Sequence, residues 1–233
     1  LLGSGRYRAC SYSLPPRRRQ QRLPSLVKHR AKWRSLRNVY GKIGHIREDW
    51  LTPCDYLPLI HALLGDLDLD PCSTHDANQQ FLRAKQIYTL DDDGLNIEAP
   101  WTGKTYLFPP TYGRCTYSKQ RGTWRWSPRG GSVSKAPSVI WFRRLVKEWK
   151  LRNIPEALFY TTYPEMLRTC PEIWDFPLCF PKDRANLIHG RKYFTLKSPM
   201  YWGYFAYLPP ADLGFSQIDK FESIFSTIGR VIR

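Results

Sequence analysis

Three short polar stretches follow strand-like segments of this sequence, and their residue types suit the binding of a polar ligand. They are DPCS at residues 70–73, DDDG at residues 91–94 and PPTYGR at residues 109–114. Carboxylate oxygens accept hydrogen bonds from hydroxyl, amino and ammonium groups. Because ligands of open α/β sheets bind beyond the carboxyl ends of the strands, the three stretches predict one shared binding edge.

These stretches belong to a longer series of motifs that resembles a known enzyme family. The series is DWLTP (49–53), LDPCS (69–73), DDGL (92–95), FPPTYGR (108–114) and LCFPKDRANLIHGRKYF (178–194). In this order the motifs resemble the phage-type, Dam-like DNA N6-adenine methyltransferases, and the resemblance covers roughly residues 49–208. It implies a Rossmann-like fold that uses S-adenosylmethionine as its cofactor.

The resemblance also implies which side chains contact that cofactor. Thr52 and Pro53 would flank it, Asp70 would lie near its methionine or ribose part, and Asp92 or Asp93 would face its ribose or adenine. Each aspartate has an alternative interpretation as a helix cap or turn residue. No glycine-rich G-x-G run accompanies Asp70, so close approach of the backbone to the cofactor is not predicted.

The motif that would carry catalysis departs from the family pattern. In the family, N-P-P-Y begins with a side-chain oxygen that accepts a hydrogen bond from the target amino group, and its aromatic residue stacks on the flipped base. Here the counterparts are Phe108, Pro109, Pro110 and Tyr112, with Thr111 interposed. Since phenylalanine has no acceptor atom, we expect methyl transfer to an amino group to be lost.

The positive charge of the chain is concentrated in two segments. The formal net charge is +16, of which residues 1–47 contribute +13 and residues 114–135 contribute +6, both without any acidic residue, so the rest carries −3. Two uncompensated basic segments on a near-neutral body predict binding to a polyanion. The candidate cations of the first segment are Arg17, Arg18, Arg19, Lys28, Arg30, Lys32, Arg34 and Arg37.

The second segment lies in an insertion, residues 115–137, where arginines alternate with tryptophans. Its candidate nucleic-acid contacts, with the preceding arginine, are Arg114, Lys119, Arg121, Trp124, Arg125, Trp126 and Arg129. Aromatic and guanidinium groups together can stack on unpaired bases and bind phosphates, which suits RNA or single-stranded DNA, and of the two RNA is favoured. The alternative is a solvated loop whose tryptophans cover the body.

The remaining periodicity predicts an α/β domain behind a basic extension. We expect residues 1–47 to be an N-terminal extension with a short basic helix near residues 26–40, and residues 48–233 to form the domain. Helices are expected near residues 57–64, 75–85, 137–153 and 216–232, and strands near 67–70, 86–90, 104–108, 155–161, 191–196 and 201–208. They predict a mostly parallel sheet of about seven strands with an antiparallel hairpin at its edge.

Several classes of protein are not indicated. No apolar run is long enough for a membrane helix, and the first residues lack the layout of a secretory signal, so we expect a soluble protein that is not secreted. Six scattered cysteines without a C-x-x-C pair predict neither disulfides nor a zinc ribbon. Cys72 and His75 have metal-like spacing without a second pair, so no metal site is expected.

Three classes of function remain open. The first is a methyltransferase-like pseudoenzyme that binds RNA within a larger assembly, such as an organellar ribosome. The Arg- and Ser-containing basic extension is also typical of a leader for a mitochondrion or plastid. The second class is an active S-adenosylmethionine-dependent N6-adenine methyltransferase on DNA or RNA, and the third is a protein-interaction subunit.

Overall fold

The computed structural model describes residues 50–110, 114–127, 137–189, 201–212 and 214–233. The proposed basic extension, Thr111, Tyr112, Arg129 and the expected strand at 191–196 lie outside the described residues. No helix in these described ranges is both long enough and apolar enough to cross a membrane.

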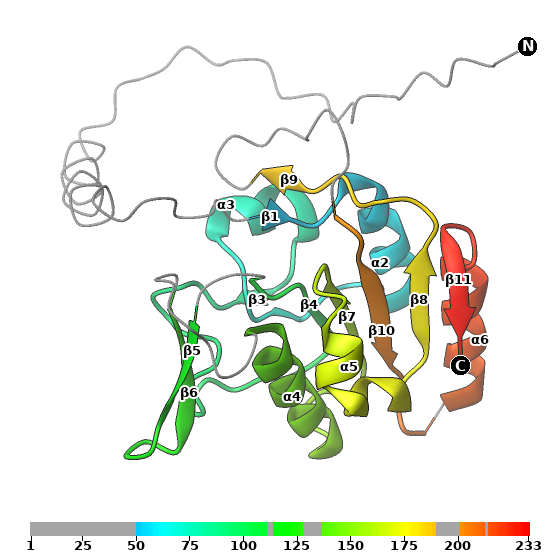
Figure 1. Ribbon diagram of the computed structural model, residues 1–233. Coiled ribbons are helices and arrows are strands. Elements are labelled where there is room, and N and C mark those ends of the chain that lie inside the picture. The colour runs from blue at the N-terminus through cyan, green and yellow to red at the C-terminus, as the bar shows by residue number, and fades with distance from the viewer. Residues whose placement is uncertain (1–49, 111–113, 128–136, 190–200, 213) are drawn as a thin grey trace, which may run out of the picture. The chain divides into compact units, whose positions relative to one another are not determined.

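A seven-stranded sheet organises the domain (Figure 1). From one edge to the other its strands are β11 (Gly229–Ile232), β8 (Leu178–Pro181), β10 (Tyr204–Leu208), β7 (Ala157–Thr161), β4 (Thr105–Leu107), β2 (Leu69–Asp70) and β3 (Gln86–Ile87). β3, β2, β4 and β7 pair in parallel, whereas β10 is antiparallel to both β7 and β8, and β11 is antiparallel to β8. Five strands therefore run the same way, which confirms a mostly parallel sheet.

The aromatic strand β10 differs from the expectation in its position. It lies inside the sheet, between β7 and β8, and all five of its residues are buried. A strand that is apolar on both faces is stabilised by two neighbours and two covered faces, which an edge cannot offer. The antiparallel edge of the sheet is formed by β8 and β11 instead.

The end of the chain also differs from the expectation of a single last helix. Helix α6 (Gly214–Phe225) ends earlier, and β11 follows it after a short turn. Gly229 opens β11, where a Cβ atom would lie 2.1 Å from the Phe180 carbonyl oxygen. A glycine at this close approach lets the two backbones pair.

Helices cover both faces of the sheet (Figure 1). α2 (Leu57–Leu64) and α6 contact each other on one face, whereas α4 (Pro137–Lys150) and α5 (Met166–Thr169) lie on the other. The remaining helical pieces are η1 (Cys54–Tyr56), α3 (His75–Ala77), η2 (Asn78–Leu82) and η3 (Pro171–Asp175). Gly65 follows α2 with a φ of 71°, a conformation that glycine adopts without steric cost.

The core divides into two clusters because the side chains of a strand alternate between the faces. Leu107 and Phe159 pack with α4, whereas Tyr106 and Tyr160 pack with α2 and α6. Consecutive residues of β4 and β7 therefore pack against helices on opposite faces of the sheet. This alternation decides which of the residues near the strand ends meet one another.

Two short two-stranded sheets complete the described structure. β1 (Trp50–Leu51) pairs antiparallel with β9 (Ile188–His189). β5 (Arg114–Ser118) pairs antiparallel with β6 (Thr123–Ser127), so the first part of the expected insertion is a regular β-hairpin. We refer to residues 114–127 as the hairpin.

Candidate functional site

The strand order reverses between β2 and β4, and this reversal locates the candidate site. From β2 the chain passes outward to β3, and the next strand of the sheet, β4, lies on the opposite side of β2. In open α/β sheets a crevice forms at the carboxyl ends of the strands at such a switch point. Asp70 ends β2 and Phe108 follows β4, so both sequence-predicted positions lie at this edge.

Asp70 is a buried carboxylate that is held within its own turn. Its side chain is 3% exposed, and it accepts hydrogen bonds from the Cys72 backbone N–H, at 3.1 Å, and from the Ser73 hydroxyl. Burial raises the pKa of Asp70 to about 6, and these two hydrogen bonds oppose the rise. The residue thus keeps its charge near neutral pH while part of its hydrogen-bonding capacity is already used.

Thr52 and Pro53 are both buried. The Thr52 hydroxyl shares a hydrogen bond of 2.9 Å with the Tyr106 hydroxyl, and the Pro53 carbonyl accepts one of 3.0 Å from the Tyr56 N–H. Tyr106 belongs to β4, so the first contact ties the start of the domain to the centre of the sheet. Both residues have structural partners at the positions expected for cofactor contacts.

Phe108 packs as an apolar residue. It is half-buried against the α2-side core, and its ring centroid lies 4.9 Å from that of Tyr160. The Tyr160 hydroxyl is buried and has no hydrogen-bond partner. A Cβ atom at Gly203 would lie 2.4 Å from this hydroxyl, so the backbone at Gly203 covers it closely. Pro109 is buried and Pro110 half-buried beside this cluster.

The acidic turn at residues 91–94 is fixed by its own contacts. Asp92 accepts hydrogen bonds from the Thr89 N–H, at 2.8 Å, and the Thr89 hydroxyl, at 2.7 Å, and these bonds hold the pKa of Asp92 below its ordinary value. Asp93 lies 3.8 Å from Arg125 of the hairpin. Burial raises the pKa of Asp93, whereas backbone hydrogen bonds and the Arg125 charge lower it.

The acidic turn also packs directly on the loop after β2. A Cβ atom at Gly94 would lie 2.2 Å from the Pro71 carbonyl oxygen, and the Trp101 indole donates a hydrogen bond of 2.9 Å to the Gly94 carbonyl. Backbone thus occupies the space between the two loops. The structure brings together two of the three polar stretches that the sequence singled out.

These contacts bear on whether the chain can hold S-adenosylmethionine. Of the polar side chains expected to bind it, Thr52 bonds to Tyr106, Asp70 to its own turn, Asp92 to Thr89, and Asp93 pairs with Arg125. A cofactor pocket needs polar groups that converge on the ligand. The polar groups of all four residues are therefore engaged by other groups of the protein, and the four residues do not fit the cofactor.

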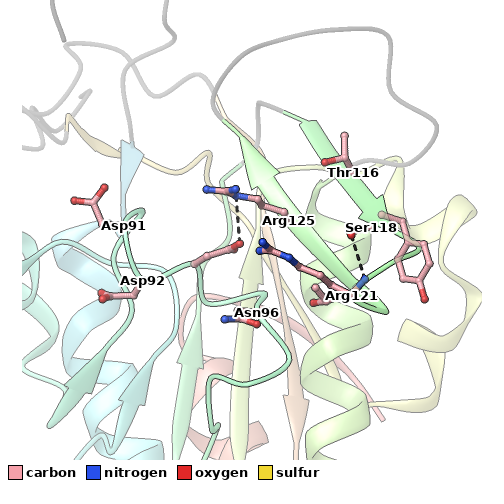
Figure 2. A pocket seen from close by; sticks show the side chains of 10 residues that line it. Asp91, Asp92, Asn96, Thr116, Ser118, Arg121 and Arg125 are labelled. Carbon is pink, nitrogen blue, oxygen red and sulfur yellow. Dashed lines mark hydrogen bonds and ion pairs between the residues drawn. The ribbon is translucent and has the colours of Figure 1, made fainter. Parts of the chain in front are cut away.

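The hairpin and the acidic turn enclose a pocket of about 430 Å³ (Figure 2). We call it the hairpin pocket. The three aspartates 91–93 and Asn96 line one side, and Thr116, Tyr117, Arg121 and Arg125 line the other. The Thr123 hydroxyl donates a hydrogen bond of 3.0 Å to the Leu95 carbonyl and so ties the hairpin to the segment after the turn.

The candidate nucleic-acid residues of the hairpin separate into two groups. Lys119, Arg121 and Arg125 are exposed, whereas Trp124 and Trp126 are half-buried and pack against the α4-side core. Cross-strand register explains the division, because Trp124 faces Tyr117 and Trp126 faces Cys115, while Arg125 faces Thr116 on the opposite side. The tryptophans thus anchor the hairpin to the body.

Sequence reasoning missed the pocket residues Asn96, Thr116 and Tyr117. The signal that was present is the alternation of apolar residues at 115 and 117 and at 124 and 126, which is the period of two that a half-buried hairpin shows. Within the described residues no group of three or more His, Cys, Asp or Glu side chains could hold a metal ion.

Comparison with known proteins adds no further assignment. No family model, curated protein or solved structure matches this chain.

Proposed function

We propose that this chain is a methyltransferase-like protein that has lost methyl transfer and binds nucleic acid, RNA in preference to DNA, as a component of a larger assembly. An organellar ribosome is the assembly that the basic extension favours. The observation that carries the proposal is the packing of Phe108 against Tyr160. Phe108 occupies the position at which the methyltransferase family that the sequence resembles has an oxygen acceptor.

The loss of an acceptor at Phe108 has a large expected effect on catalysis. Removing one oriented hydrogen-bonding group from a closed active site costs about 3 kcal/mol, or 100-fold or more in rate. Tyr160 contacts Phe108 and carries a polar group, but its hydroxyl is buried beneath Gly203. Together with the internally bound Asp70 and Thr52, this arrangement supports a scaffold without transfer activity.

The exposed cations of the hairpin support the binding of nucleic acid. Lys119, Arg121 and Arg125 project from a ribbon whose tryptophans are fixed on the core, so their positions are set by a folded element. Such cations bind phosphates and release counterions. Tyr117 is 51% exposed and is the hairpin ring available for stacking on an unpaired base.

A binding measurement tests this function directly. Lys119→Ala with Arg121→Ala is expected to weaken binding of a single-stranded RNA and to reduce the slope of log affinity against log salt by about 1.4, since each lost phosphate contact removes about 0.7. The matched control is Lys147→Ala with Lys150→Ala, two exposed lysines on α4. Equal affinities and slopes for both double variants would count against the hairpin as the binding element.

A methyl-transfer assay tests the loss of catalysis separately. With tritiated S-adenosylmethionine and either DNA or RNA, the full chain is expected to transfer no label above background. Robust transfer that Asp70→Asn abolishes would overturn the proposal and establish an active methyltransferase instead.

A further inference from the structure

An exposed tryptophan lies at the same edge of the sheet as the candidate site, beside strands that the site does not use. β8 ends at Pro181 and the antiparallel β10 begins at Tyr204, so the residues after β8 and those before β10 lie at the carboxyl edge of the parallel strands (Figure 1). Trp202 precedes β10 and is 64% exposed. Since tryptophan is highly buried on average, an indole this exposed is a candidate contact surface.

The backbone on both sides of Trp202 is anchored. Tyr201 forms a β-bridge with Ala185, whose N–H donates a hydrogen bond of 2.6 Å to the Tyr201 carbonyl, and the Tyr201 ring packs against the α2-side core. A Cβ atom at Gly203 would lie 2.4 Å from the Tyr160 hydroxyl, so the residue after Trp202 lies directly on the core. The exposed indole therefore projects from a backbone that is fixed before and after it.

A guanidinium group covers one face of this indole. The Arg184 Cζ atom lies 5.5 Å from the centroid of the Trp202 ring, which is a cation–π contact. Since Trp202 is 64% exposed with this face occupied, its other face is open to water. The contact with Arg184 restricts rotation of the indole and so orients the open face for a second planar group.

The cations beside the indole have no acidic partner within the described ranges. Lys182 and Arg184 are exposed and form no salt bridge there, and with Asp183 between them the three residues carry a formal charge of +1. A partner that joins a planar group to an anion complements this surface, and a nucleobase with its phosphate is such a partner. An apolar protein surface would cover the indole but leave the two cations without a counter-charge.

From these contacts we infer that Trp202 is a stacking platform for an unpaired base of single-stranded nucleic acid. The base stacks on the open face of the indole, Arg184 holds the opposite face, and Lys182 and Arg184 bind the adjacent phosphates. This inference rests on the proposed nucleic-acid binding and adds to it a second contact surface, at the carboxyl edge of the sheet and separate from the hairpin.

Strands with and without bases test the platform on the full chain. The probe is an oligouridine of about ten nucleotides, within the usual site size for single strands, and its control is an abasic sugar–phosphate strand of the same length. Fluorescence anisotropy is expected to show that Trp202→Ala weakens binding of the oligouridine about tenfold, the effect typical of removing one stacking ring. The abasic strand is expected to bind this variant and the wild type equally, because it has no base to stack. Trp202→Tyr keeps a ring and is expected to retain most of the affinity for oligouridine.

Further variants separate stacking from charge. Trp174→Ala removes another exposed indole, 52% exposed on η3, and is expected to leave the affinity for oligouridine unchanged. Lys182→Ala is expected to reduce the slope of log affinity against log salt by about 0.7, the value for one phosphate contact, whereas Trp202→Ala leaves the slope unchanged. Equal affinities of Trp202→Ala and Trp174→Ala for oligouridine would overturn the platform and leave the proposed nucleic-acid binding intact. If the wild type binds neither strand, the platform and the proposed function both fail.

Discussion

At the scale of single residues, the buried polar groups near the strand ends are unevenly satisfied. Asp70 and Thr52 have hydrogen-bond partners, whereas the Tyr160 hydroxyl has none. A buried polar group without a partner costs more free energy than a paired one contributes. The two kinds of residue should therefore respond in opposite ways when their polar atoms are removed.

Tyr160→Phe is expected to leave the free energy of unfolding unchanged or to raise it by about 1 kcal/mol, because the variant removes an unpaired buried hydroxyl and keeps the ring. The control is Tyr207→Phe, whose hydroxyl donates to Glu156 at 2.5 Å inside the same face of the sheet. That variant is expected to lose about 2 kcal/mol, since it removes a hydrogen bond to a buried carboxylate. Urea unfolding compares the two, and a loss of stability in Tyr160→Phe equal to that in Tyr207→Phe would show that Tyr160 is hydrogen-bonded.

The pKa of Asp70 makes stability depend on pH in a defined direction. Burial raises this pKa from 3.8 to about 6, so its stabilising contribution is full below about pH 4 and is lost as the pH rises through about 6. The stability of the wild type relative to Asp70→Asn should therefore fall by about 2 kcal/mol between pH 4 and pH 7. Unfolding curves at several pH values measure this difference, and parallel pH profiles would contradict it.

At the scale of elements, long periodic segments were predictable and short irregular ones were not. The expected helix at residues 57–64 and the strands that became β2, β4 and β7 are confirmed. The helix α4 begins at Pro137, as its apolar stripe indicated. The hairpin was not predicted as strands because polar residues dominate its composition and only two apolar residues alternate on each strand.

β11 was missed for a different physical reason. Its four residues continue the pattern of the preceding helix, and only pairing with β8 gives them an extended conformation. The interior position of β10 likewise depends on which neighbours it meets far along the chain. At the candidate site, the sequence located the polar loops, but the hydrogen bond between Thr52 and Tyr106 is a tertiary contact that spacing does not show.

The packing of the acidic turn on the loop after β2 depends on Gly94. Gly94→Ala would place a Cβ atom 2.2 Å from the Pro71 carbonyl oxygen, so we expect it to lower the free energy of unfolding by more than 2 kcal/mol and to separate the two loops. The control is Gly122→Ala in the turn of the hairpin, where no atom lies within 4 Å and only a φ of 64° opposes a side chain, at a cost of about 1 kcal/mol. Thermal unfolding ranks the two variants, and the reverse order would contradict the close approach at Gly94.

At the scale of the whole molecule, the positive charge is concentrated in two segments of the sequence. The body carries −3 once the two basic segments are set aside, so the attraction of the chain to a polyanion depends on those segments. The location of the positive charge could be predicted from the sequence, because it requires only a count of the charged residues. The hairpin pocket could not, since it forms between two segments whose polar sides meet only in the folded chain.

The contribution of the basic extension to binding follows from its charge. Replacing Arg17, Arg18 and Arg19 by serine is expected to weaken RNA binding and to reduce the slope of log affinity against log salt by up to about 2, with about 0.7 per lost phosphate contact. A salt titration with a single-stranded RNA measures the affinity and the slope, and an unchanged slope would exclude these arginines from phosphate binding.

The interior position of β10 has a consequence for the order in which the chain can fold. β8 emerges from the ribosome before β10, yet its link to the parallel half of the sheet is β10 itself. During synthesis a nascent chain in which β7 and β8 have emerged thus carries two strands with unpaired edges until β10 has emerged as well. Since unpaired strand edges favour association between chains, this interval is the stage of biogenesis at which the protein most needs a chaperone.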